Sequence, residues 1–348
     1  MKHAFAIALD AMGGDHGPSV VVPAALQVLS ETPQLHIVLV GDEQVLQSEL
    51  DSHRQSLSDR LSIQHASQQV AMDEKPSVAL RTKKDSSMRV AINLVKEGRV
   101  QACVSAGNTG ALMATARFVL KTLPGIDRPA IISSLPNINK GVTHMLDLGA
   151  NVDVSADNLF EFAVMGSVLT SAVDNIEAPT IGLLNIGEEE VKGNERVKEA
   201  ARILAESDLN YTGFVEGDDI FKGTVDVVVC DGFVGNISLK TTEGVAKLIS
   251  HFLREEFKRN LFTKLAAMMA MPVLNALKRR IDPRRYNGAS LVGLQGIVIK
   301  SHGGADQLAY ASAIREAIVE VKKNVPERIS KHVEQVMTQR ATTQGQAV

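Results

Sequence analysis

The stretch that decides the fold is residues 101–120, QACVSAGNTGALMATARFVL, in which a short apolar run passes through a glycine turn into a helical pattern. We expect Gln101–Val104 to form a buried strand, Ser105–Gly110 a turn, and Ala111–Leu120 a helix rich in Ala, Leu and Met. A strand followed at once by a helix is the building unit of a parallel sheet.

The same unit recurs along the chain. Further apolar runs end in glycine or polar turns at Ala4–Leu9, His36–Val40, Thr143–Leu148, Thr180–Asn185 and Val225–Cys230. The segments between them have the spacing of amphipathic helices, as in Met88–Glu97, Leu159–Val173 and Glu195–Glu206. Nearly continuous apolar strands separated by helices predict a Rossmann-like α/β fold, with a mostly parallel sheet covered by helices on both faces.

The length of 348 residues suits one large α/β domain or two smaller ones. The sequence contains neither a low-complexity linker nor a repeat of fixed period. We predict a single domain over residues 1–337, with a helical hairpin protruding at about 245–285. The polar residues 338–348 are expected to be a disordered tail.

Composition excludes several classes of protein. A hydrophobic content of 45% is too high for a disordered chain, and 4% aromatic residues do not suit base stacking on nucleic acid. The two cysteines, Cys103 and Cys230, cannot build a disulfide framework and indicate a cytoplasmic protein. The longest apolar window, Leu265–Leu277, is too short for a membrane span. Common motifs of dinucleotide-binding proteins, P-loop enzymes, zinc proteases and serine hydrolases are missing.

In parallel sheets, ligands bind beyond the carboxyl ends of the strands, where this sequence concentrates Gly, Asn, Asp and Ser. We therefore expect one polar cleft shared by these turns. In the turn after residue 104, small residues let backbone N–H groups approach an anion, and a helix N-terminus adds partial positive charge. The predicted phosphate cradle consists of Ser105, Gly107, Asn108, Thr109 and Gly110. An ordinary helix cap at Asn108 or Thr109 is compatible with this interpretation.

Three further polar segments are candidates for the cleft. Lys192 stands on a loop before a helix, where its ammonium can reach a ligand, although surface lysines are abundant. Asn236 follows a strand in the segment DGFVGN and is either a site residue or a helix cap. Arg81 and Lys84 belong to a basic, hydroxyl-rich run that either contacts a phosphate-bearing substrate or begins a solvated helix.

Seven segments together resemble one protein family. They are ALDAMGGD (8–15), KKDSSM (83–88), VSAGNTGALMA (104–114), DLGAN (147–151), LNIGE with KGN (184–188 and 192–194), DGFVGN (231–236) and GIVIKSHG (296–303). In this order they resemble the PlsX-type phosphate acyltransferases of bacterial phospholipid synthesis. The resemblance extends over nearly the whole chain and implies a fold like those of phosphotransacetylase and isocitrate dehydrogenase.

The resemblance implies transfer of a long-chain acyl group from acyl carrier protein to inorganic phosphate, which yields acyl phosphate. A downstream membrane enzyme would pass that acyl group to glycerol 3-phosphate on the way to phosphatidic acid. The resemblance assigns Lys192 and Asn236 as the catalytic pair, with no cofactor and no metal. Our interpretation is that Lys192 neutralises phosphate or the thioester oxyanion, while Asn236 orients the carbonyl through a hydrogen bond.

Residues 254–285 contain nine Lys or Arg and three Asp or Glu, a net charge of +6. Apolar residues recur there at helical spacing, which predicts a basic amphipathic hairpin. Such a hairpin suits an anionic membrane surface or an acidic carrier protein, and the alternative is helix packing in a homodimer. The expected contact residues are Phe257, Leu261, Phe262, Leu265, Met268, Met269, Lys278, Arg279 and Arg280.

Two other functions stay open at this point. One is a phosphotransacetylase-like acyltransferase that uses a coenzyme A thioester, and the other is a membrane-recruited scaffold of lipid synthesis without catalysis. Donor preference discriminates the two enzymes, because the basic hairpin matters only for a protein donor or a membrane. A dehydrogenase rests on fold analogy alone, and we expect no nucleic-acid partner.

Overall fold

The computed structural model describes residues 5–346, with the side chains of residues 5–336. Its strands form one sheet in the order β3-β2-β1-β4-β11-β10-β5-β6-β9-β7-β8. In chain order the strands are β1 Phe5–Asp10, β2 Leu35–Gly41, β3 Leu61–His65, β4 Ala102–Ser105, β5 Ala130–Pro136, β6 Val142–Leu146, β7 Ile181–Leu184, β8 Tyr211–Val215, β9 Val227–Val229, β10 Ala289–Val292 and β11 Ile297–Lys300.

The sheet consists of two parallel blocks that run in opposite directions. Strands β3, β2, β1, β4 and β11 are parallel to one another, as are β6, β9, β7 and β8. Between the blocks, β10 is antiparallel to β11 and β5, and β5 is antiparallel to β6. The prediction of a mostly parallel sheet is confirmed. The two blocks run in opposite directions, but the pairing register places Leu146, at the end of β6, in one row with Leu9, Val104 and Ile299, so the carboxyl ends of the two blocks meet at the same level of the sheet.

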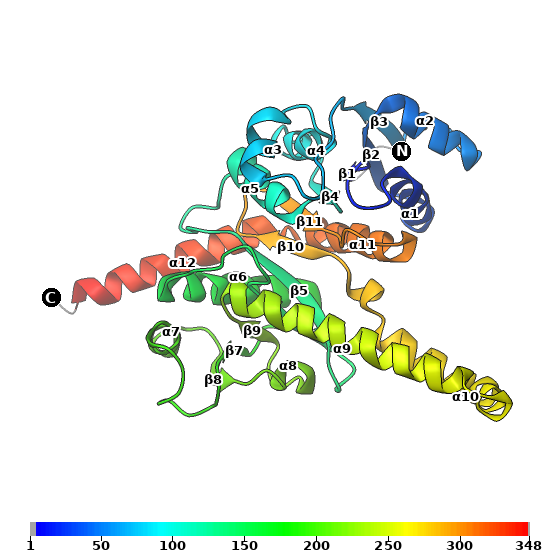
Figure 1. Ribbon diagram of the computed structural model, residues 1–348. Helices are drawn as coiled ribbons and strands as arrows, with labels where there is room; N and C mark the ends of the chain where they lie inside the picture. The colour runs from blue at the N-terminus through cyan, green and yellow to red at the C-terminus, as the bar shows by residue number, and fades with distance from the viewer. Residues whose placement is uncertain (1–4, 347–348) are drawn as a thin grey trace.

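Helices cover both faces of the sheet, as predicted, and Figure 1 shows the two layers. They are α1 Pro18–Glu31, α2 Glu43–Ser52, α3 Pro76–Thr82, α4 Ser87–Lys96, α5 Thr109–Leu120, α6 Ala156–Asp174, α7 Glu195–Ala205, α8 Asp219–Lys222, α9 Gly232–Lys258, α10 Leu261–Ile281, α11 Gln307–Lys323 and α12 Val325–Gln346, with a short 3₁₀ helix at Pro283–Tyr286.

The alternation of side chains along each strand divides the core between the two faces. Leu9, Val104 and Ile299 occupy one row of the register and pack under α1 and α11. In the other block, Leu146 and Val229 belong to the core beneath α6 and α12. The neighbouring residues of each strand point to the opposite face, where the core includes residues of α4 and α5.

Helices α9 and α10 contact each other and project from the body of the molecule (Figure 1). The only buried residues of α9 are Gly232 and Gly235 in its first turn, and α10 has none. Asn260 and Thr263 form a capping box at the start of α10. The pair therefore begins on the sheet and extends into solvent.

At the other end of the chain, α12 is helical as far as Gln346. The tail predicted over residues 338–348 lies where the structure describes no side chains, and residues 347 and 348 lie outside the described chain. Over the described residues, no helix combines the length and the apolar character that crossing a membrane requires.

Candidate functional site

Three polar side chains lie in one row at the carboxyl ends of β1, β4 and β11. Ser105 is in register with Asp10 on one side and with Lys300 on the other. The Ser105 hydroxyl donates a 2.6 Å hydrogen bond to Asp10 Oδ2, and the N–H of Gly107 donates a 3.0 Å bond to Ser105 Oγ. Ser105 thus links the end of the sheet to the turn that the sequence predicts as a phosphate cradle.

The next residues of the turn begin α5. Asn108 Oδ1 accepts a 2.9 Å hydrogen bond from the N–H of Ala111, so Asn108 is the helix cap. Its side-chain amide also donates to the carbonyl oxygens of Met72 and Glu74. Thr109 and Gly110 are exposed at the first turn. The side chain of Asn108 is occupied by structural bonds, whereas the helix N-terminus faces solvent.

The turn also depends on a glycine. A Cβ at Gly107 would lie 2.7 Å from the terminal methyl of Met88 and 3.2 Å from Ser105 Oγ. No larger residue fits without moving one of these neighbours, which explains why the backbone approaches the polar row so closely.

Lys300 is a buried lysine that the sequence analysis did not select as a site residue. Its ammonium donates to the carbonyl oxygens of Ala106, at 3.3 Å, and Ser301. Burial lowers the pKa of Lys300 to about 8. Asp10 was missed as well. Both residues lie inside segments quoted for the family resemblance, ALDAMGGD and GIVIKSHG, and their signal was a charged residue at the end of an apolar strand.

Asp147 lies directly after β6, at the carboxyl end of the second parallel block. Its Oδ1 accepts backbone hydrogen bonds from Ile131, Gly149 and Ala150, at 2.9, 3.2 and 3.0 Å. Its Oδ2 accepts from both the backbone and the side-chain amide of Asn151, at 2.7 and 3.0 Å. Burial raises the pKa of Asp147, and these hydrogen bonds act against that rise. One carboxyl group therefore fixes the loop 147–151.

Asn236 lies in the first turns of α9, beside that loop. Asp231 caps the helix by accepting from the N–H of Val234, so Asn236 has no capping role. Asn236 is exposed, and a Cβ on Gly149 would lie 3.4 Å from its Cβ. The close approach of α9 to the loop thus presents the Asn236 amide to solvent.

Lys192 lies on the loop after β7, the strand next to β9 in the sheet. Its ammonium is 2.7 Å from Glu189 Oε2, and Asn185 donates a 3.2 Å hydrogen bond to its carbonyl oxygen. The side chain of Lys192 is 43% exposed, and the hydrogen bond to Glu189 raises its pKa. The lysine is therefore charged and accessible, and its counter-ion is a carboxylate on the same loop.

Helix α9 lies near the carboxyl ends of both blocks. It starts beside Asn236, and the positive charge of Lys240, one turn later, contributes to the lowered pKa of Lys300. Burial lowers the pKa of His302, and the positive charge of Lys247, two turns further on, lowers it further. The structure therefore groups Ser105 and Gly107 with Asp10 and Lys300, and it places Asn236 with the loop after β6 and Lys192 on the neighbouring loop.

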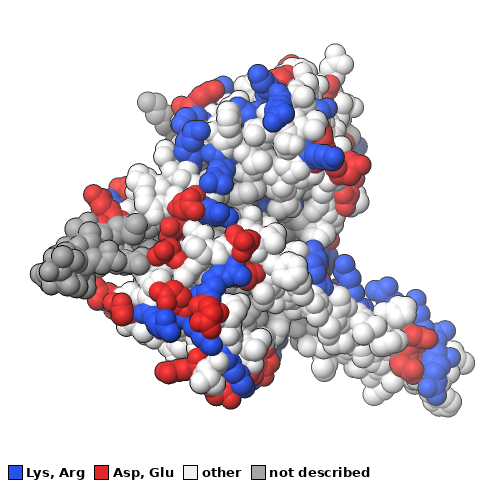
Figure 2. Space-filling view, turned by 60° about the vertical axis from the view of Figure 1, so that its left-hand side comes forward, with Lys and Arg blue, Asp and Glu red and all other residues white. Residues whose placement is uncertain are grey.

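Other predicted residues lie at the surface. Arg81 and Lys84 are exposed at and after the end of α3, a helix that contacts α5. On the projecting pair, Leu261, Phe262 and Met269 are about four-fifths exposed. Figure 2 shows blue Lys and Arg side chains along this pair. The remaining predicted contact residues there are exposed too, apart from the half-buried Phe257.

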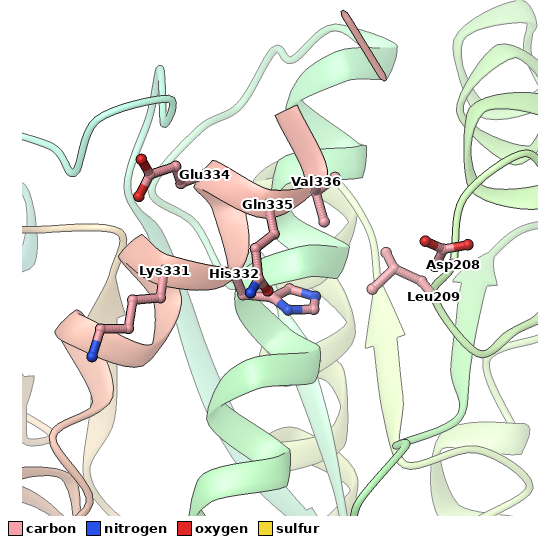
Figure 3. Close-up of a pocket in the computed structure, with 7 residues that line it drawn as sticks. All are labelled: Asp208, Leu209, Lys331, His332, Glu334, Gln335 and Val336. Atoms are coloured by element: carbon pink, nitrogen blue, oxygen red, sulfur yellow. The ribbon is translucent and has the colours of Figure 1, made fainter. Parts of the chain in front are cut away.

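A hollow of about 670 Å³ lies elsewhere, between α12 and the loop before β8 (Figure 3). It is lined by Asp208, Leu209, Lys331, His332, Glu334, Gln335 and Val336. None of the predicted site residues borders it. Within the described residues, no three His, Cys, Asp or Glu side chains are grouped to hold a metal ion.

Comparisons with known proteins give matches to proteins of acyl transfer and of fatty acid synthesis. A model of the "fatty acid synthesis protein" family matches residues 5–328. A phosphate acyltransferase of Nitrosococcus oceani is 66% identical, and the match covers 94% of this chain and 96% of that protein. A phosphate acyltransferase of Methylococcus capsulatus is 63% identical, and the match covers 96% of this chain and 98% of that protein. A crystal structure of a phosphotransacetylase from Streptococcus pyogenes superposes with a TM-score of 0.62 over 92% of this chain and 94% of that one, at 18% identity, which shows a shared fold.

Proposed function

The chain belongs to the fatty acid synthesis protein family and is a phosphate acyltransferase, and from this membership we propose that it moves a long-chain fatty acyl group from acyl carrier protein to inorganic phosphate. The acyl phosphate formed would then supply a membrane acyltransferase that acylates glycerol 3-phosphate. Inorganic phosphate and acyl carrier protein are thus the two partners that the enzyme has to bring together.

The reaction needs positioning and charge stabilisation more than a nucleophile from the protein. A phosphate oxygen attacks the thioester carbonyl, the new C–O bond forms and the C–S bond breaks. The proton of hydrogen phosphate ends on the released carrier thiol. Because both partners are anionic, cationic side chains and backbone N–H groups are the groups that favour the reaction.

The observation that carries the proposal is the turn before α5. Ser105 and Gly107 bring the backbone close to the end of the sheet, and the exposed N-terminus of α5 follows directly. A helix N-terminus supplies N–H donors and partial positive charge, which together favour a phosphate. Arg81 and Lys84, on the adjoining segment, are proposed to attract the anionic substrates.

Lys192 and Asn236 are proposed as the catalytic pair. The ammonium of Lys192 is charged and accessible, and a substrate anion would replace Glu189 as its partner. The amide of Asn236 is exposed and bears no capping bond, so it is free to donate to the thioester carbonyl. Their elements follow neighbouring strands of one parallel block, which supports a common role.

We assign the projecting pair to a peripheral membrane contact of a cytoplasmic enzyme. Helix α10 carries exposed apolar side chains and has Lys278, Arg279 and Arg280 in its last turn, a combination that favours anionic lipid. Docking of the acidic carrier on the same surface is the alternative. A membrane contact would also bring acyl phosphate to the enzyme that consumes it.

A homodimer is the assembly that we propose. Val245, Leu248, Ile249 and Phe252 are each about half exposed on α9. Their spacing of three and four residues places them on one face of the helix, and a second copy of the chain would cover that face. Size measurement by light scattering, with Phe252→Glu as the disrupting variant, tests the assembly.

The function is tested by measuring acyl phosphate formed from palmitoyl-acyl carrier protein with and without inorganic phosphate, and from palmitoyl-coenzyme A as the competing donor. We expect phosphate-dependent product with the carrier thioester. Lys192→Ala and Asn236→Ala should each lower turnover by about 10²–10³, the usual effect of losing one donor to an oxyanion. Arg202→Ala, on an exposed ion pair, is the control. Absence of phosphate-dependent product with either donor would contradict the proposal.

A further inference from the structure

Asp10, Ser105 and Lys300 form a polar row inside the sheet, beneath the turn that we propose as the phosphate cradle. They hold the same register position on three adjacent strands, so their side chains point to the same face. Their exposed fractions are only 1, 2 and 9%. Burying a carboxyl and an ammonium group costs free energy unless each finds partners, so the row has to be explained by what the groups bind.

The hydrogen bonds of this row are incomplete at both ends. The Lys300 ammonium has three N–H donors, and it uses two of them on the carbonyl oxygens of Ala106 and Ser301. Asp10 Oδ2 accepts from Ser105, whereas Asp10 Oδ1 has no hydrogen-bond partner among the residues that the structure describes. One donor and one acceptor therefore remain for a ligand.

Hydrogen phosphate offers the complementary groups, because it carries unprotonated oxygens that accept and one hydroxyl that donates. We propose that Lys300 and Asp10 are the phosphate-binding side chains of this enzyme, with Lys300 donating to a phosphate oxygen and Asp10 Oδ1 accepting from the phosphate hydroxyl. The inference rests on the proposed function of the turn above the row. It adds two residues that the family resemblance and the motif analysis left without a role.

The charges around the row fit this ligand. Burial lowers the pKa of Lys300 to about 8; Asp10 and Asp15 act against that change, and Lys240 on α9 adds to it. Burial also raises the pKa of Asp10, and the hydrogen bond from Ser105 is the strongest influence against that rise. A bound dianion would stabilise the ammonium form of Lys300, and its hydroxyl would supply the donor that Asp10 lacks.

The first test uses the unmodified enzyme and two anions of similar size. Sulfate has the same shape and charge as hydrogen phosphate but has no hydroxyl, so it leaves Asp10 Oδ1 facing an unprotonated oxygen. Competition against phosphate in the acyl transfer assay should give sulfate an inhibition constant at least 10-fold above the KM for phosphate. Equal affinity for the two anions would overturn the assignment of Asp10.

The second test separates the two side chains. Lys300→Met, which removes the charge at similar volume, should raise the KM for phosphate by about 10- to 100-fold, the range for a hydrogen bond to a charged group. Lys300→Arg should recover part of the loss, and Lys331→Met, on an exposed lysine, is the matched control. Asp10→Asn should bring sulfate and phosphate closer in affinity. An unchanged KM in a folded Lys300→Met protein would overturn the assignment of Lys300.

Calorimetric titration with inorganic phosphate alone distinguishes this inference from the proposed function. Loss of phosphate binding in Lys300→Met supports the assignment whatever the acyl donor is. If the unmodified enzyme binds phosphate through Lys300 but makes no product from the carrier thioester, the proposed donor is wrong and the binding site stands. If phosphate binding is the same in both proteins, the site is refuted even where acyl transfer from the carrier occurs.

Discussion

Asp147 Oδ2 accepts hydrogen bonds from both the backbone N–H and the side-chain amide of Asn151, four residues further along the chain. The carbonyl oxygen of Asn151 in turn accepts a 2.8 Å hydrogen bond from the N–H of Gly232, the first residue of α9. The position of α9, and with it that of Asn236, therefore depends on one buried carboxylate.

Replacing that carboxylate should affect both stability and catalysis. In Asp147→Ala, five hydrogen bonds are lost and buried N–H groups stay unsatisfied, so we expect the free energy of unfolding to fall by about 2–4 kcal/mol. Urea unfolding measures this loss. Turnover should fall at temperatures where the variant is still folded, because Asn236 shifts; unchanged turnover would show that Asn236 does not need this loop.

Two glycines of the same helix should respond in opposite ways to alanine. A Cβ on Gly235 would collide with the carbonyl oxygen of Asp147, whereas a Cβ on Gly244 meets nothing within 4 Å. We expect Gly235→Ala to lower the melting temperature and activity. Gly244→Ala should stabilise the helix by about 0.5–1 kcal/mol, the usual gain over glycine inside a helix. Thermal unfolding of the pair checks this, and equal effects would contradict the packing described for the first turn.

Glu320 on α11 gives a pH dependence of stability. Burial raises its pKa to about 8, with the neighbouring Glu316 adding to the rise, while the unfolded value is near 4.3. The folded state thus holds the proton more tightly, so its stability falls as pH rises from about 4.3 through 8. Burial also raises the pKa of Glu316; His144 lowers that pKa, and Asp174 raises it.

Glu320→Gln removes this titration and should therefore melt above the unmodified protein at pH 9, with a smaller difference at pH 5.5. Each 1 kcal/mol corresponds to about 2–4 °C for domains of 150–250 residues. Glu177→Gln, on an exposed glutamate, should show no such dependence. A melting difference that does not change between the two pH values would refute the assignment to Glu320.

The projecting pair should bind vesicles without contributing to the stability of the body. Phe262→Asp with Met269→Asp replaces two side chains that are 86% and 79% exposed, so we expect a melting temperature within 1–2 °C of the unmodified protein. Flotation with vesicles containing anionic lipid should fall at least 10-fold. Retained flotation with lost activity toward the carrier thioester would instead assign this surface to the carrier.

The local units of the fold were predictable from sequence, because an apolar run, a glycine turn and an amphipathic helix are each encoded by neighbouring residues. The strand expected at Gln101–Val104 corresponds to β4, and the helix expected at Glu195–Glu206 corresponds to α7. Strand order was not predictable, because short apolar runs do not encode their partners. The antiparallel pairings of β10 and β5 make the second block run opposite to the first, and no local pattern in Ala289–Val292 predicts this change of direction.

The residues of the candidate site also differ in how much of their role is encoded by neighbouring residues. Ser105 and Gly107 could be found because small residues between a strand and a helix are a local signal for an anion. Asp10 and Lys300 have only a weak local signal, a charged residue at the end of an apolar strand, and its meaning depends on Ser105, which is 95 and 195 residues away in the chain. The assignment of Lys192 and Asn236 as the catalytic pair stays a prediction.

Helix α9 is a single uninterrupted rod that runs from the body of the molecule to the base of α10. Its 27 residues extend about 40 Å. Its first turn packs against the loop 147–151 and is hydrogen-bonded to it, so a bending motion of the helix would pivot about this turn. A tilt of about 5° would displace the far end by about 3 Å and Asn236, next to the pivot, by well under 1 Å. The tip can therefore follow an uneven surface while the proposed catalytic amide keeps its place.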